Sequence, residues 1–223
     1  MTVRQARFMP STLAGGPGWG AWASSPARPT RRRRYIVAEF ARRRPGWRAE
    51  PRQAAWTDPS AGLADGEVDA ALPRLPFPGQ EAPRVEVLFG EERWVAPPST
   101  HRLAERAQIA FRELWDEPFV AAPAETGAWR DHWPAAGGRE GRPVRIGAVT
   151  EQPDDWLSAI AGGYGIALAP ASAARFHARP GVVHRPVTGV SPTRIAVARA
   201  PAGDRNPVVR DFVRCCPDLA RTT

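Results

Sequence analysis

The sequence predicts an α/β fold with an open sheet, because strand patterns follow helix patterns along the chain. Residues 36–47 place apolar side chains such as Ile36 and Phe40 at helical spacing, until Pro45-Gly46 ends the helix. Residues 67–72 then alternate between the two faces of a strand. A strand after each helix implies parallel pairing and right-handed crossovers. Such sheets bind ligands at the carboxyl ends of their strands, so we expect a ligand receptor.

The first third of the chain is expected to hold three strands and three helical segments around one irregular stretch. The strands are expected at residues 3–10, 48–56 and 68–72. The helical segments are expected at residues 11–14, at 36–44, and around Leu63 as far as Gly66. Residues 15–30 are dense in Gly, Pro and Ser without any period, which predicts loop or disorder.

The rest of the chain alternates strands and helices after a proline-rich connection. One or two strands broken at Gly90 are expected within residues 85–96. Further strands are expected at residues 119–121, 144–149, 166–169, 182–187 and 193–198. Helices are expected at residues 103–114 in part, 127–136, 154–161, 171–176 and 207–215. Two sets of about four strands each fit a chain of two lobes.

The net charge of +8 does not indicate nucleic-acid binding by the globular part. Residues 1–50 hold 11 arginines and 2 acidic residues, whereas residues 51–223 hold 20 arginines and 21 acidic residues. The basic excess therefore lies near the start, where Arg31 to Arg34 form a run. This run could contact phosphates, but a short arginine run beside Gly/Pro-rich sequence is more often a solvated segment.

Signals for membranes and disulfides are sparse in this sequence. No apolar run approaches the roughly 20 residues that a membrane span needs, and no secretory signal is visible, so we expect cytoplasmic residence. The cysteines, Cys215 and Cys216, are adjacent, and adjacent cysteines form a disulfide only with strain. Inert thiols are therefore expected.

Six motifs within residues 36–215 resemble the effector-binding domain of LysR-type transcriptional regulators. They are RRRPGW, LADGEVDAAL, FGEERWVAPPSTHRLA, LWDEPFVAAP, VTEQPDDWLSAIAGGYGIALAPASAARF and NPVVRDFVRCC. The resemblance implies an α/β fold of two Rossmann-like lobes, similar to type 2 periplasmic binding proteins and joined by two crossing strands. The implied division is an irregular segment at 1–35 with a possible first strand, lobe 1 at 36–90 and 196–223, and lobe 2 at 91–195. The crossing strands would lie near residues 88–95 and 193–198.

The sequence also departs from the family pattern. Family members begin with a winged helix-turn-helix, and we expect this chain to lack it through truncation or frameshift and to be unable to bind DNA alone. Proline stands where the family favours an apolar residue at Pro51, Pro73, Pro83, Pro97 and Pro134. Pro51 falls in an expected strand and Pro73 ends one, so each removes a possible ladder donor. These departures raise the hypothesis of a decayed or fragmentary gene.

The resemblance further implies effector contacts, since the cleft of such a fold collects helix N-termini and hydroxyl groups. The implied contacts are Ser11, Thr12, Trp56, Thr57, Ala124, Thr126, Thr150 and Glu151. Serine and threonine at these points are equally suited to capping helices. Trp129 or Trp133 could wall an aromatic effector or pack in the core. The implied dimer interface comprises Ile36, Val37, Phe40 and Arg44.

No catalytic residue, metal or cofactor is expected. The four histidines lie at no metal-ligand spacing, and GxSxG, Walker and GxGxxG motifs are absent from the sequence. The leading hypothesis is an effector sensor that binds a small, possibly carboxylate-bearing molecule. It would form a homo-oligomer, or a hetero-oligomer with an intact LysR-type regulator, and meet DNA only indirectly. The alternatives are a stand-alone solute-binding protein, a cytoplasmic enzyme on a two-lobed fold, and a non-functional gene fragment.

Overall fold

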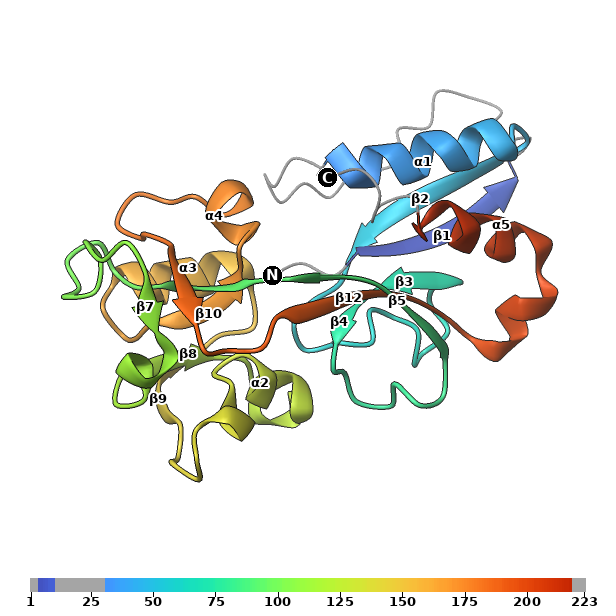
Figure 1. The fold of residues 1–223 in the computed structure, drawn as a ribbon. Coiled ribbons are helices and arrows are strands. Elements are labelled where there is room, and N and C mark those ends of the chain that lie inside the picture. Colours follow the sequence, from blue (N-terminus) through green and yellow to red (C-terminus); the bar gives the residue numbers. More distant parts are fainter. Residues whose placement is uncertain (1–3, 11–30, 218–223) are drawn as a thin grey trace.

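Two lobes joined by long strands make up the computed structural model, which describes residues 4–10 and 31–217 (Figure 1). One lobe is built on a six-stranded sheet, and the other on a four-stranded and a two-stranded sheet. β5 (Arg84–Glu91) leads into β6 (Arg93–Ala96), and β12 (Thr193–Arg199) returns antiparallel to β5. The chain therefore crosses between the lobes twice, along neighbouring strands.

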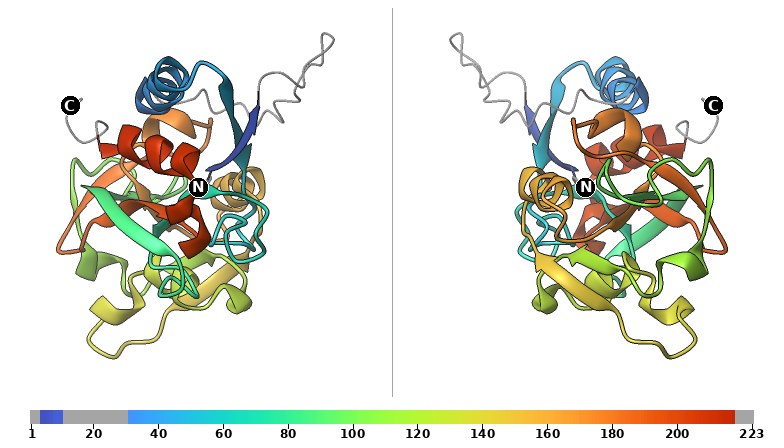
Figure 2. Two further views of the ribbon diagram at one scale, coloured as in Figure 1. Left: turned by 90° about the vertical axis from the view of Figure 1, so that its right-hand side faces the viewer. Right: turned by 90° about the vertical axis from the view of Figure 1, so that its left-hand side faces the viewer.

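The six-stranded sheet has the order β2-β1-β3-β12-β4, and β5 also pairs with β12. Its other strands are β1 (Arg4–Pro10), β2 (Trp47–Gln53), β3 (Ala70–Leu72) and β4 (Arg74–Leu75). Two helices, α1 (Arg31–Arg43) and α5 (Pro207–Cys215), lie beside each other in this lobe (Figure 2). Phe40 of α1 and Phe212 of α5 pack edge to face, with ring centroids 5.7 Å apart. The apolar faces of the two helices are thus buried together.

The expected parallel pairing is wrong for this sheet, because β1 pairs antiparallel with both β2 and β3. Pro10, the last residue of β1, lies opposite Trp47, the first residue of β2. The chain therefore leaves β1 and enters β2 at the same end of the sheet. A crossover between parallel strands would have to carry it to the opposite end.

The short helix expected around Leu63 is also absent, since residues 57–67 form a series of turns. The Asp58 carboxylate accepts hydrogen bonds from the Ser60 hydroxyl at 2.5 Å and from the Gly62 N–H. Ala61 between them has a φ of 60°, which a right-handed helix does not allow. These local bonds hold the backbone in turns, and Leu63 is nevertheless buried, as expected.

The second lobe mixes the expected parallel pairing with antiparallel pairing, since β6 pairs antiparallel with β10 (Ala167–Pro170) and β11 (Arg185–Thr188). β8 (Pro118–Ala121) pairs parallel with β9 (Arg145–Val149), and β7 (Ile109–Ala110) pairs parallel with β11. The four-stranded sheet has the order β10-β6-β11-β7. Three helices accompany these strands: α2 (Ala128–His132), α3 (Pro153–Ala161) and α4 (Ala173–Phe176).

Short 3-10 helices complete the described elements. They are η2 (Phe111–Leu114), η3 (Ala124–Thr126), η4 (Ala136–Gly138) and η5 (Pro201–Arg205). The helix expected at residues 103–114 is thus reduced to η2, and the break expected at Gly90 falls at Glu92 instead. The helix and loop expected at residues 11–30 lie outside the described residues.

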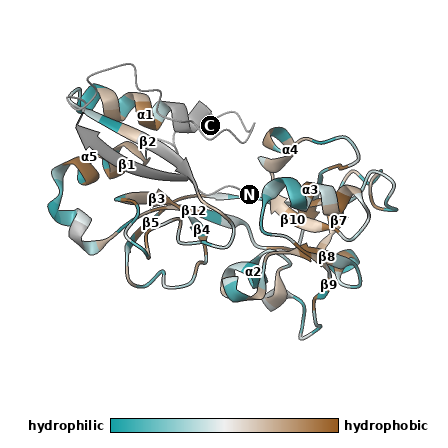
Figure 3. Cartoon of the chain, turned by 180° about the vertical axis from the view of Figure 1, so that it is seen from behind, coloured by the Kyte–Doolittle hydropathy of each residue, from teal (hydrophilic) through white to brown (hydrophobic). Residues whose placement is uncertain are grey.

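Three buried clusters form the core, and one of them extends across both lobes. It joins Leu63 and Ala198 of the first lobe to Val120 and Ile160 of the second. The helices of both lobes carry hydrophilic and hydrophobic segments side by side (Figure 3). No helix in the described parts of the chain is long and apolar enough to cross a membrane.

The five prolines flagged in the sequence stand where a sheet tolerates them. Pro51 lies in β2, at the edge of the six-stranded sheet, where a missing N–H donor need not break a ladder. The others lie outside the strands, and two of their carbonyl groups accept backbone bonds: Pro73 from Ala196 at 3.1 Å and Pro97 from Val183 at 3.1 Å. The prolines are therefore compatible with this fold.

Candidate functional site

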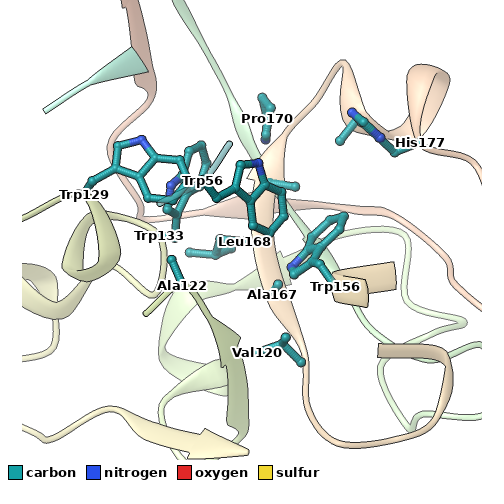
Figure 4. Close-up of a pocket in the computed structure, with 12 residues that line it drawn as sticks. Trp56, Val120, Ala122, Trp129, Trp133, Trp156, Ala167, Leu168, Pro170 and His177 are labelled. Atoms are coloured by element: carbon teal, nitrogen blue, oxygen red, sulfur yellow. The ribbon is translucent and has the colours of Figure 1, made fainter. Parts of the chain in front are cut away.

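Four tryptophans from both lobes meet between the lobes (Figure 4). Trp56 follows β2 in the first lobe, whereas Trp129, Trp133 and Trp156 lie in or next to α2 and α3 of the second. The ring centroid of Trp56 is 6.1 Å from that of Trp129 and 5.9 Å from that of Trp156. Trp129 and Trp133 are 5.7 Å apart. All three distances fall in the range of favourable aromatic pairs, about 4.5 to 7 Å.

Strand topology brings these side chains together. Trp56 comes after the carboxyl end of β2, Trp129 and Trp133 come after β8, and Trp156 comes after β9. Because β8 and β9 are parallel, the segments that follow them emerge at the same edge of their sheet. This edge is where sheets of this type place their ligands.

The tryptophan pocket is the hollow that these rings enclose. Its lining consists of Trp56, Val120, Ala122, Trp129, Trp133, Trp156, Ala167, Leu168, Ala169, Pro170, Ala173 and His177. The free volume among these side chains is about 30 Å³, which is room for no more than a few water molecules. In this conformation the indole rings themselves fill the space between the lobes.

No Asp, Glu or Arg side chain is part of this lining, as far as the described residues go. Besides His177, the polar side-chain atoms of the lining are indole nitrogens. The Nε1 atoms of Trp129 and Trp133 are buried and have no hydrogen-bond partner among the described residues. A buried donor without a partner costs about 1–3 kcal/mol, so a ligand oxygen that accepts from either N–H would recover that energy.

The residues expected to contact an effector lie at different places in the structure. Trp56 lines the tryptophan pocket, whereas Thr57 and Glu151 are exposed and do not line it. Ala124 lines a different hollow, on the outer side of α2. Thr126 is buried, and its hydroxyl donates to the Pro123 carbonyl at 2.7 Å, so this donor is already used within η3. Ser11 and Thr12 lie outside the described residues.

Thr150 is the hydroxyl residue with unfilled capacity near the pocket. Its N–H donates to the Ala121 carbonyl at 3.0 Å, which places it beside the end of β8. Its Oγ1 is buried without a partner among the described residues. Ala122, the residue after Ala121, lines the tryptophan pocket. Thr150 is therefore hydrogen-bonded to the residue that directly precedes a lining residue.

The sequence motifs do not single out Trp156, Ala122 or Val120, although all three line the pocket. The sequence does offer one signal: Trp56 ends a predicted strand, and Trp129, Trp133 and Trp156 lie in predicted helices that follow strands. Their convergence, however, depends on the distance between the two lobes, which no local pattern contains.

The residues expected at a dimer interface divide between the core and the surface. Ile36 is 2% exposed and Phe40 is 0% exposed, so both are buried against the chain's own α5. Val37 is 36% exposed. Arg44 pairs with Asp211 of α5 at 2.6 Å and is partly exposed. Val37 and Arg44 are thus the members of this set that reach the surface.

Reactive cysteines and metal clusters do not add to this site. Cys215 and Cys216 are free and buried, and burial raises the pKa of both thiols. Within the described part of the chain, no group of three or more His, Cys, Asp or Glu side chains could hold a metal ion.

Comparison with solved structures shows that the two-lobed fold is shared with known proteins. The reduced form of OxyR matches with a TM-score of 0.63 and 22% identity, over 85% of this chain and 89% of that chain. The effector binding domain of QuiR in complex with shikimate matches with a TM-score of 0.61 and 16% identity, over 75% and 79%. HinK, a LysR family transcriptional regulator from Pseudomonas aeruginosa, matches with a TM-score of 0.62 and 20% identity, over 83% and 64%.

The sequence profile described as LysR substrate binding domain matches residues 30–221. The chain therefore belongs to the LysR substrate-binding domain family. It spans 64% of the HinK chain, which is less than two thirds of that regulator's length. No match was found among curated protein sequences.

Proposed function

We propose that this chain is the effector-sensing domain of a LysR-type transcriptional regulator and binds a small molecule between its lobes. One lobe would comprise residues 36–90 and 196–223, and the other residues 91–195. The tryptophan pocket carries the proposal, because it lies between the lobes at the ends of strands, where such sheets bind ligands. The QuiR domain, which is similar in fold, was solved with the small molecule shikimate.

The lining of the pocket indicates the chemistry of its ligand. A flat apolar ring would replace contacts that the indole rings now make with one another. An acceptor oxygen, such as that of a carboxylate or a hydroxyl group, would take the N–H of Trp129 or Trp133. Thr150 would add a hydroxyl group at the end of the neighbouring strand. We therefore propose an aromatic or cyclic acid as the class of effector.

Binding would require the lobes or the indole rings to rearrange, because about 30 Å³ of free space cannot hold such a molecule. Trp56 is the first-lobe side chain in the cluster, so its displacement would part the two lobes locally. A ligand shifts such an equilibrium only by its difference in affinity for the two arrangements. The environment of Trp56, and with it the tryptophan fluorescence, should therefore change on binding.

The proposal is tested by titrating the full chain with aromatic and aliphatic acids, followed by calorimetry and tryptophan fluorescence. Trp129→Phe keeps a ring but removes the indole N–H, so affinity for the best ligand should fall about fivefold. Trp47→Phe makes the same change in the first lobe, away from the pocket, and should leave affinity unchanged.

Two outcomes would contradict this function. One is a folded chain that binds no acid of the panel. The other is an equal loss of affinity in both tryptophan variants. A chain without a cooperative thermal transition would instead favour the hypothesis of a non-functional gene fragment.

Oligomer formation is the second part of the proposed function. Val37 exposes an apolar side chain on the outer side of α1, at 36% of its full exposure. Arg44 lies at the end of the same helix. We propose that this side of α1 pairs with a second copy of the chain or with an intact LysR-type regulator.

A further inference from the structure

Arg93 is a buried cation on β6, at the point where the chain crosses between the lobes. Only 3% of the surface of this residue is exposed. Nε donates to the Ser191 carbonyl at 2.7 Å, and Nη1 donates to the His132 carbonyl. Burial lowers the pKa of Arg93 to about 10, so the group remains charged at neutral pH. Both acceptors are neutral, whereas buried charges are normally paired with an opposite charge.

The nearby carboxylate of Glu91 is already committed to other donors. Its Oε2 accepts from Arg74 Nη2 at 2.8 Å, and its Oε1 accepts from the Ser172 N–H at 2.6 Å. Among the described residues, no carboxylate forms an ion pair with Arg93. The third nitrogen of its guanidinium group, Nη2, has no hydrogen-bond partner among them either.

The surroundings of Arg93 are positive as well. Burial first, and then the charges of Arg93, Arg74 and Arg194, together lower the pKa of His132 to about 3. His132 is therefore neutral at pH 7, and its buried Nε2 has no partner among the described residues. Of the three arginines, Arg74 is the one with a carboxylate partner in the described structure. Apart from the exposed carboxylate of Asp131, the charged groups that an anion would meet here are positive.

A pocket of about 410 Å³ opens beside Arg93, within the size range of small-molecule sites. Its lining includes Pro76, Arg93, Phe111, Asp131, His132 and Ser191, and we call it the hinge-side pocket. It shares no lining residue with the tryptophan pocket. Helix α2 separates the two, since Trp129 lies on one face of the helix and Asp131 and His132 line the pocket on the other.

We propose that the hinge-side pocket binds the oxyanion of a small molecule, a carboxylate or a phosphate group, through the guanidinium of Arg93. The anion would supply the charge partner that Arg93 lacks, and a planar guanidinium suits either group. Because the lining comes from both lobes and from the crossing strand, bound anion would favour the present arrangement of the lobes. The site does not depend on an effector in the tryptophan pocket.

Calorimetry on the full chain tests this site, with sodium phosphate and sodium acetate as separate probes at constant ionic strength. Arg93→Gln should weaken binding of the preferred anion about tenfold or more, since it removes a charge-assisted bond. Asp131→Asn removes an exposed carboxylate from the lining and should tighten binding about threefold. Arg210→Gln removes an exposed arginine of α5 and should change nothing.

The outcomes separate this proposal from the effector site. Tighter binding by Asp131→Asn supports it even if Arg93→Gln fails to fold. Trp129→Phe should leave anion binding unchanged, so either site can fail without the other. The proposal is overturned if neither anion binds the wild-type chain, or if Arg210→Gln weakens binding as much as Arg93→Gln does.

Discussion

Burial of His132 links the stability of the fold to pH. In the folded chain its pKa falls from the usual 6.5 to about 3, because burial and three arginines disfavour the charged ring. The unfolded chain takes up a proton near pH 6.5 and the folded chain does not. The contribution of His132 to the free energy of unfolding is therefore most favourable above pH 6.5, and it falls as the pH drops toward 3. Between pH 7 and pH 5 we expect the free energy of unfolding to fall by about 2 kcal/mol because of His132. Urea unfolding at the two pH values measures this change.

His132→Phe is the matched test of this pH dependence. The variant keeps an aromatic ring beside Trp133, whose ring centroid lies 5.2 Å from that of His132, but it cannot take up a proton. Its stability should fall less than that of the wild type over the same pH interval. A variant with the wild-type pH dependence would assign the effect to His184, whose pKa burial also lowers.

Individual site residues could be predicted from the sequence only in part. Trp56 was expected at the end of a strand; β2 ends at Gln53, three residues earlier, and Trp56 lines the pocket between the lobes. Thr126 follows a strand in the same way, yet its hydroxyl turns back to the Pro123 carbonyl. Position after a strand thus locates a residue near the site, while the competition between local and ligand hydrogen bonds decides its role.

At the scale of elements, an aromatic contact lies at the centre of the buried cluster between α1 and α5. Phe40 is fully buried and packs edge to face on Phe212. Phe40→Ala leaves a cavity that the two helices cannot close, so we expect a loss of about 3–5 kcal/mol in the free energy of unfolding. Chemical denaturation of wild type and variant measures this loss.

Arg42→Ala is the control on the same helix, because the Arg42 side chain is 72% exposed and its ion pair with Glu39 lies at the surface. Such a change should cost no more than about 0.5 kcal/mol. The experiment also distinguishes the two roles considered for Phe40. A core residue gives a loss independent of protein concentration, whereas a dimer contact gives a loss that grows with concentration.

The helices and strands of the second lobe follow closely from their apolar periods. α3, for example, runs from Pro153 to Ala161, close to the predicted residues 154–161. The first lobe was harder to predict. The direction of β1 relative to β2 depends on how the chain returns after Pro10, and the turns before Gly66 depend on a single carboxylate, Asp58. Periodicity contains neither piece of information.

At the scale of the whole molecule, the two-lobed architecture came from the resemblance between motifs, and the family match supports it. The closure of the lobes could not be predicted, because it depends on three-dimensional distances among the indole rings of Trp56, Trp129 and Trp156. In a domain closed in this way, the chain's own indole rings fill the space between the lobes before any effector binds. An effector must then compete with the aromatic contacts that the chain makes with itself.

The assembly of whole chains gives the last prediction. If the outer side of α1 forms an interface, Val37→Arg places a new charge within it, and burying an unpaired charge is costly. The dissociation constant of the dimer should rise about tenfold or more, which sedimentation equilibrium over a range of concentrations measures. Val87→Arg is the matched control, since Val87 on β5 is 52% exposed and lies away from α1. A wild-type chain that is monomeric at every concentration would contradict the interface, as would equal dissociation by both variants. Because Val37 is exposed in the single chain, its replacement should not lower the stability of the monomer, so loss of assembly and loss of folding can be told apart.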